Sequence, residues 1–105
     1  MRKANYKLVR DKIPEIIEEQ GKVCVVRELS CGEYLEMLDA KLDEELSEYH
    51  KDQNLEELAD LMEVIYAAAE ARGYTREQLE QTRSRKAAER GVFRKRLLLL
   101  EVRDS

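Results

Sequence analysis

The chain has few of the residues that build zinc sites, disulfides and covalent catalytic centres. Its 105 residues include two Cys, one His, one Pro, one Phe and no Trp. Cys24 and Cys31 lack the spacing of a zinc site and require no disulfide, so they fit a reducing cytosol. His50 stands alone in a predicted turn, and we assign it no role. Because no Ser, Cys or His is placed to act as a nucleophile, we do not expect a covalent intermediate.

Long apolar runs are also missing. No stretch approaches the ~18 apolar residues that indicate a membrane span. The opening segment MRKANYKLVRDK lacks the apolar region of a secretion signal. We therefore expect a cytoplasmic protein that does not enter a membrane. The length suits one domain over residues 1–105 with a modest core, because no linker or repeat interrupts the chain.

Charged residues are plentiful and unevenly distributed. They make up 40% of the chain, and the net charge is −4. That net charge combines +4 over residues 1–12, −13 over 13–70 and +5 over 71–105. An acidic middle between basic ends suits a site where carboxylates hold a metal ion while Lys and Arg bind phosphates. The alternative is charge scattered over a solvated surface. The pI of about 5.2 and the lack of interleaved aromatic residues argue against nucleic acid as the main ligand.

Capping signals predict four helices. Ser30 and Thr75 each open a capping box, and Asn54 can cap a further helix. The only Pro lies in the first turn of a short helix, and Gly residues follow three of the predicted helix ends. The helices are expected over residues 14–20, 30–49, 54–72 and 75–90.

Two further features shape the expected fold. Segments 22–29 and 92–102 are apolar and predicted to be extended, so they could pair as a short two-stranded ribbon. The helix 54–72 is apolar almost all round from Leu58 to Ala69, which implies burial on both sides. In so short a chain, the second side is expected to meet another subunit. The predicted fold class is therefore all-α, a bundle of about four helices with a short β ribbon, completed by dimerisation.

A group of carboxylates in the middle of the chain is the main functional signal. Residues three apart share a helix face, so Glu45 and Glu48 form one pair and Glu57 and Asp60 another. Two such pairs facing each other on adjacent helices would form a cage of oxygen ligands, which Mg²⁺ prefers. Glu45 lies at the edge of the apolar face of its helix, whereas Glu44 points nearly opposite to that face, toward solvent.

The same carboxylates have simpler structural interpretations. Glu57 stands three residues after Asn54, where a capping-box Glu belongs. Lys41 can pair with Glu44 and Glu45 one turn later in the same helix. Single matches are therefore weak, and the sequential pair of motifs on neighbouring helices is more specific.

The predicted helix 75–90 carries a basic stripe. Arg83, Lys86 and Arg90 fall within about 60° of one another on the helical wheel. This stripe cannot be a core face, so it meets either solvent or an anion.

The motif KLDEELSEY followed by EELADLMEV resembles the EExxE…ExxD signature of the MazG-like superfamily of all-α nucleoside triphosphate pyrophosphohydrolases. The end segments YKLVRDKIPEII and KAAERGVFRKRLLLLEV are similar to a short, single-domain branch of house-cleaning NTP pyrophosphatases. That branch is also described as phosphoribosyl-ATP pyrophosphohydrolase-like. The resemblance covers about residues 6–102. It implies a homodimer or dimer of dimers that hydrolyses a nucleoside triphosphate, expected to be non-canonical, between its α and β phosphates.

The resemblance also implies roles for individual residues. The ligands of Mg²⁺, with Mn²⁺ as a substitute, are then Glu45, Glu48, Glu57 and Asp60. The candidate phosphate contacts are Arg10, Lys12, Lys86 and Arg90. For in-line attack by a metal-bound water, Glu45 is the expected water-side ligand, and Glu44 is a weaker candidate for the general base.

Two alternatives stay open at this point. One is a non-catalytic helical module of the same fold that binds a protein partner. The other is an enzyme whose substrate is phosphoribosyl-ATP. The sequence does not choose the base or the sugar of the substrate.

Overall fold

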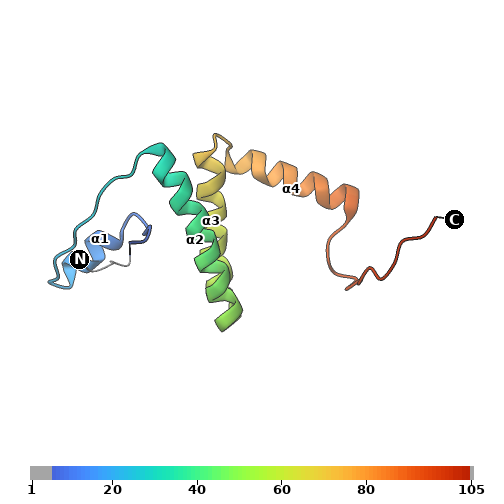
Figure 1. Ribbon diagram of the computed structural model, residues 1–105, viewed down its shortest axis with the longest axis horizontal. Coiled ribbons are helices and arrows are strands. Elements are labelled where there is room, and N and C mark those ends of the chain that lie inside the picture. Colours follow the sequence, from blue (N-terminus) through green and yellow to red (C-terminus); the bar gives the residue numbers. More distant parts are fainter. Residues whose placement is uncertain (1–5, 105) are drawn as a thin grey trace. The chain divides into compact units, whose positions relative to one another are not determined.

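The computed structural model describes residues 6–104, and all the regular secondary structure in this range is helical. The four helices are α1 (Ile13–Glu19), α2 (Cys31–Asp52), α3 (Leu55–Ala71) and α4 (Arg76–Arg90) (Figure 1). The predictions of an all-α fold and of four helices are confirmed. The chain divides into two units, Met1–Tyr74 and Thr75–Ser105, and each is described by itself. A single domain over 1–105 stays a prediction.

The three long helices begin at the predicted capping residues. The Ser30 hydroxyl accepts a hydrogen bond from the Glu33 N–H at 3.3 Å, and the Glu33 carboxylate accepts one from the Ser30 N–H at 3.1 Å. Asn54 Oδ1 accepts from the Glu57 N–H at 2.9 Å. Thr75 opens α4 with a second capping box. Each cap satisfies backbone donors that the first helical turn leaves free, which explains why these starts could be predicted.

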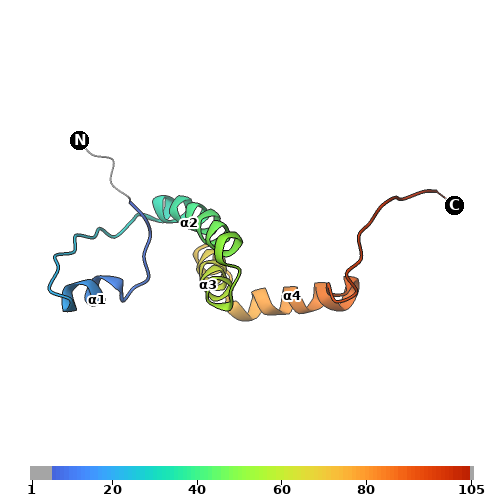
Figure 2. The same cartoon turned by 90° about the horizontal axis from the view of Figure 1, so that it is seen from below.

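Helices α2 and α3 pack side by side as an antiparallel hairpin (Figures 1 and 2). Gln53 adopts a left-handed backbone conformation with φ of 50°, and the extended Asn54 then starts α3. Helix α2 continues past its predicted end at residue 49, so the connection is only two residues long. Leu38 on α2 is 2% exposed and Val64 on α3 is 9% exposed. These two are the buried apolar side chains of the hairpin, so its hydrophobic core is small.

Among the described residues, the two apolar sides of α3 are covered to different extents. The side that carries Val64 is buried, whereas Leu55 on the other side is 80% exposed. Leu58 and Met62 are also exposed. Burial on both sides was predicted, and the described residues fully bury only the side that carries Val64.

The predicted two-stranded ribbon is wrong for the described residues. Segments 22–29 and 92–102 contain no strand. Val23, Val25 and Leu97 are almost fully exposed. A lone two-stranded ribbon is marginal in water, and β propensity expresses packing that these exposed side chains do not have. Pairing segments so far apart in sequence would also carry a loop-closure cost.

Within the unit Met1–Tyr74, α2 and α3 are the helices that pack on each other. A bundle of about four helices stays a prediction. Helix α1 has seven residues and no buried side chain. Among residues 6–104, no helix combines the length and the apolar content that crossing a bilayer requires.

Candidate metal centre

Carboxylates from both helices of the hairpin meet at one place. One oxygen from each of Glu45, Glu57 and Asp60 lies within 4.8 Å of the other two. Glu45 comes from α2, and Glu57 and Asp60 come from α3, where their three-residue spacing puts them on one face. We call these three residues the carboxylate cluster. The structure thus brings together three of the four predicted metal ligands.

The fourth predicted ligand, Glu48, belongs to a neighbouring group. One oxygen from each of Glu48, Asp52 and Glu57 also lies within 4.8 Å of the others, so Glu57 is shared between the two groups. Asp52 was not predicted, because α2 was expected to end at residue 49. Its position four residues after Glu48, on the same helix face, is the signal that would have found it.

The ammonium group of Lys41 compensates the negative charge of Glu45, the buried residue of the carboxylate cluster. Glu45 is buried. Lys41 Nζ lies 3.5 Å from Glu45 Oε1 and 3.3 Å from Glu44 Oε1. A carboxylate removed from water is costly without a cation nearby, so Lys41 stabilises Glu45. Glu44 is half-buried, pairs with Lys41 and belongs to neither carboxylate group.

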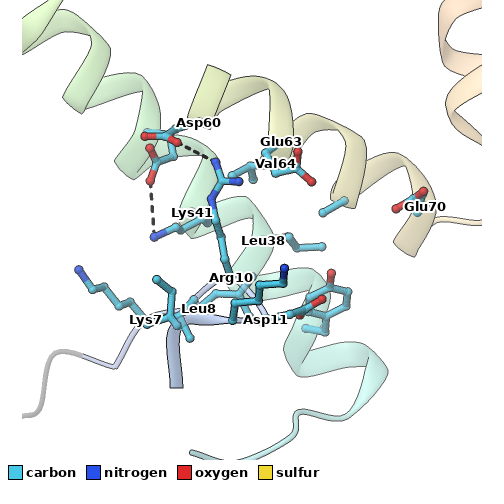
Figure 3. A pocket seen from close by; sticks show the side chains of 16 residues that line it. Lys7, Leu8, Arg10, Asp11, Leu38, Lys41, Asp60, Glu63, Val64 and Glu70 are labelled. Carbon is cyan, nitrogen blue, oxygen red and sulfur yellow. Dashed lines mark hydrogen bonds and ion pairs between the residues drawn. The ribbon is translucent and has the colours of Figure 1, made fainter. Parts of the chain in front are cut away.

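Arg10 approaches the cluster from a distant part of the sequence. Its Nη2 donates a hydrogen bond to Asp60 Oδ1 at 2.7 Å (Figure 3). The side chains of Arg10 and Asp60 are 56% and 42% exposed. The predicted phosphate contact is therefore bound, in this structure, to a predicted metal ligand.

Desolvation and then the neighbouring negative charges raise the pKa of Glu57. Loss of water contact raises the pKa of the Glu57 carboxyl, and the negative charges of Asp60, Asp52, Glu48 and Glu45 raise this pKa further. Both causes disfavour the ionised carboxylate. A divalent cation at this point would offset the repulsion among these carboxylates.

A cavity of about 720 Å³ adjoins the cluster. Residues 7–13 line one side of it, and side chains of α2 and α3 line the other. Leu38 and Val64 contribute apolar surface, while Glu45 and Asp60 contribute acidic surface. Its size lies within the range of small-molecule pockets in proteins.

The remaining predicted site residues lie in two places. Lys12 is exposed and lines the cavity beside Arg10. Lys86 and Arg90 are exposed on α4, in the second unit. Their contact with a substrate held at the carboxylates stays a prediction.

Comparison with known proteins adds one short match. No protein-family model and no solved structure matches the chain. A protein of Mycolicibacterium smegmatis (strain ATCC 700084 / mc(2)155), described as uncharacterized, is 58% identical over 41 residues. The match covers 39% of this chain and 42% of that relative. It spans less than half of either protein, so it transfers neither a family nor a function.

Proposed function

We propose that the protein is a Mg²⁺-dependent nucleoside triphosphate pyrophosphohydrolase. It would cleave its substrate, a non-canonical triphosphate, between the α and β phosphates, giving a nucleoside monophosphate and pyrophosphate. The observation that carries the proposal is the convergence of Glu45, Glu57 and Asp60 within 4.8 Å of one another. The adjoining cavity and the resemblance of the carboxylate motifs to the MazG-like signature support it.

The chemistry of the donor set fits a hard divalent cation. Each residue of the cluster offers carboxylate oxygens, which suit Mg²⁺ or Mn²⁺ better than softer metals. Glu57 connects the cluster to Glu48 and Asp52, so the acidic surface continues along the hairpin. The residues present therefore fit the ion that the function requires.

The chain's own residues would divide the remaining work. A bound Mg²⁺ would neutralise phosphate charge and activate a water molecule. Glu45 is buried and paired with Lys41, and it would be the metal ligand on the side of the attacking water. Glu44 stays the weaker candidate for the general base, because it lies outside the cluster.

Cationic side chains would bind the phosphates. Arg10 and Lys12 line the cavity beside the cluster and are suited to the substrate's phosphate groups. Lys86 and Arg90 would hold the leaving pyrophosphate. Their exposure on α4 leaves them free to meet an anion.

The decisive experiment removes one ligand at a time. Glu45→Gln or Asp60→Asn should abolish Mg²⁺-dependent pyrophosphate release and leave the helical circular dichroism intact. Asp43→Asn is the matched control, since Asp43 is exposed on α2 and belongs to neither carboxylate group. Full activity in either ligand variant would refute the metal site.

We also propose that the active form is a homodimer or a dimer of dimers. The exposed side of α3, formed by Leu55, Leu58 and Met62, supports this because obligate interfaces resemble a divided core. Leu58→Lys should lower the mass measured by light scattering, whereas Glu36→Lys on the exposed surface of α2 should not. An unchanged mass in Leu58→Lys would place the interface elsewhere.

A second candidate function is a non-catalytic module that binds a protein partner. The same exposed side of α3 favours it, because a partner could cover this surface as well as a second copy could. Thermal melting separates the two functions: the enzyme should be stabilised by Mg²⁺ with a non-hydrolysable nucleotide, and the module by neither.

The substrate and the location stay parts of the proposal. A screen of canonical and modified triphosphates, with phosphoribosyl-ATP included, for pyrophosphate release would identify the substrate. Cytoplasmic location stays a prediction, which cell fractionation would test.

A further inference from the structure

The carboxylate cluster already holds a cation that the chain itself supplies. Arg10 lies 50 residues before Asp60 in sequence, yet its guanidinium donates to Asp60 Oδ1 at 2.7 Å (Figure 3). This separates Arg10 from Lys41, which reaches Glu45 from one turn away on the same helix. A long-range contact needs the segment before α1 to lie along the hairpin, where residues 7–13 line the cavity.

We infer that Arg10 is the resident countercation of the carboxylate cluster, and that a divalent cation bound there displaces it from Asp60. The inference rests on the proposed function, because it takes the cluster as the metal site. A magnesium ion binds oxygen at about 2.0–2.1 Å. Since the guanidinium already lies 2.7 Å from Asp60 Oδ1, a divalent cation bound to this same oxygen would lie close to the guanidinium and repel it.

Displacement would change more than one ion pair. Arg10 ties residues 7–13 to α3, so its release loosens one side of the cavity. The freed guanidinium is planar and can bind phosphate oxygens with two hydrogen bonds. Metal binding would thus convert Arg10 from a countercation of Asp60 into a contact for the phosphates of the substrate.

The size of the effect follows from the exposure of the pair. Both side chains are about half exposed, and ion pairs of this kind are weak. Removing a weak competitor should therefore tighten metal binding about threefold to fivefold. A larger gain would require a more deeply buried pair.

Titration calorimetry with Mg²⁺ and Mn²⁺ tests the inference on the full chain without substrate. Arg10→Gln should bind either ion about threefold to fivefold more tightly than the wild type. Lys7→Gln is the matched control, since Lys7 has the same charge, lies in the same segment and lines the same cavity. Its affinity should stay within about twofold, because it loses charge without losing a contact to Asp60.

Hydrogen exchange on the wild type gives a second readout that needs no variant. Mg²⁺ should speed amide exchange in the peptide that contains residues 6–13. Slower or unchanged exchange in this peptide would overturn the displacement.

The two proposals fail in different ways. If the wild type binds metal and Arg10→Gln binds it equally or more weakly, the inference falls and the metal site stands. An equal gain in Lys7→Gln would also overturn the inference, because net charge alone would then explain the change. If the wild type binds neither ion, the proposed function and the inference fall together.

Discussion

Lys41 offers the sharpest test of how the hairpin tolerates a buried carboxylate. The side chains of Lys41 and Glu45 are 18% and 11% exposed, and Nζ lies 3.5 Å from Oε1. Lys41→Met keeps an unbranched apolar side chain close in length to the methylene stem of Lys and removes the ammonium group. We expect this variant to destabilise the metal-free protein, because Glu45 would then stand buried beside its acidic neighbours without Lys41.

The distance between Lys41 Nζ and Glu45 Oε1 sets the scale of this destabilisation. At 3.5 Å and an effective dielectric constant of about 20, the attraction is about 5 kcal/mol before desolvation is subtracted. Exposed ion pairs contribute about 0–1 kcal/mol, and breaking a fully buried pair costs about 3–5 kcal/mol. Since this pair is mostly but not fully buried, Lys41→Met should lower the free energy of unfolding by about 2 kcal/mol.

Urea unfolding followed by circular dichroism, in a chelator and at one protein concentration, measures this cost. The double variant Lys41→Met/Glu45→Gln should lose less unfolding free energy than the sum of the losses in the two single variants. The difference should be about 1 kcal/mol or more. Glu44→Gln is the control and should cost less than about 0.5 kcal/mol, because Glu44 is more exposed. A change of less than about 0.5 kcal/mol in Lys41→Met, or strict additivity in the cycle, would refute the reasoning.

Three further predictions concern the hairpin and its caps. Leu38→Ala should cost about 2–5 kcal/mol of unfolding free energy, and Leu46→Ala much less, because Leu38 is buried and Leu46 is exposed. Asn54→Ala should cost about 1 kcal/mol through loss of the cap that starts α3. The Arg27 guanidinium lowers the pKa of Glu33 from 4.5 to about 2, so this stabilisation is present above pH 4.5 and is lost as pH falls toward 2.

A specific outcome would contradict each of these three predictions. Equal losses in Leu38→Ala and Leu46→Ala would mean that the hairpin packs through a different face. If Asn54→Ala melts like the wild type, the cap contributes nothing measurable to α3. Glu33→Gln should make the melting temperature depend less on pH between pH 2 and 4.5. A pH dependence equal to that of the wild type would contradict the ion pair.

Helix starts depend on local interactions, whereas strand pairing depends on contacts between distant segments. Ser30, Asn54 and Thr75 were predicted as helix starts and are helix starts, because each cap bonds to a backbone group three residues away. The end of α2 was placed three residues too early, and Asp52 was therefore missed. The β ribbon of residues 22–29 and 92–102 was wrong, because a strand needs a neighbour that only tertiary packing can supply.

The amino-acid sequence by itself determined four helices, the capping residues of the three long ones and the shared face of Glu57 and Asp60, since helical periodicity and capping act over three or four residues. Tertiary structure alone decided that Glu45 joins them, that Val64 rather than Leu55 is buried, and that Arg10 reaches Asp60. These outcomes depend on how α2, α3 and the segment before α1 pack together. Packing between segments far apart in sequence balances desolvation, burial and charge over the whole hairpin, and no local pattern encodes that balance.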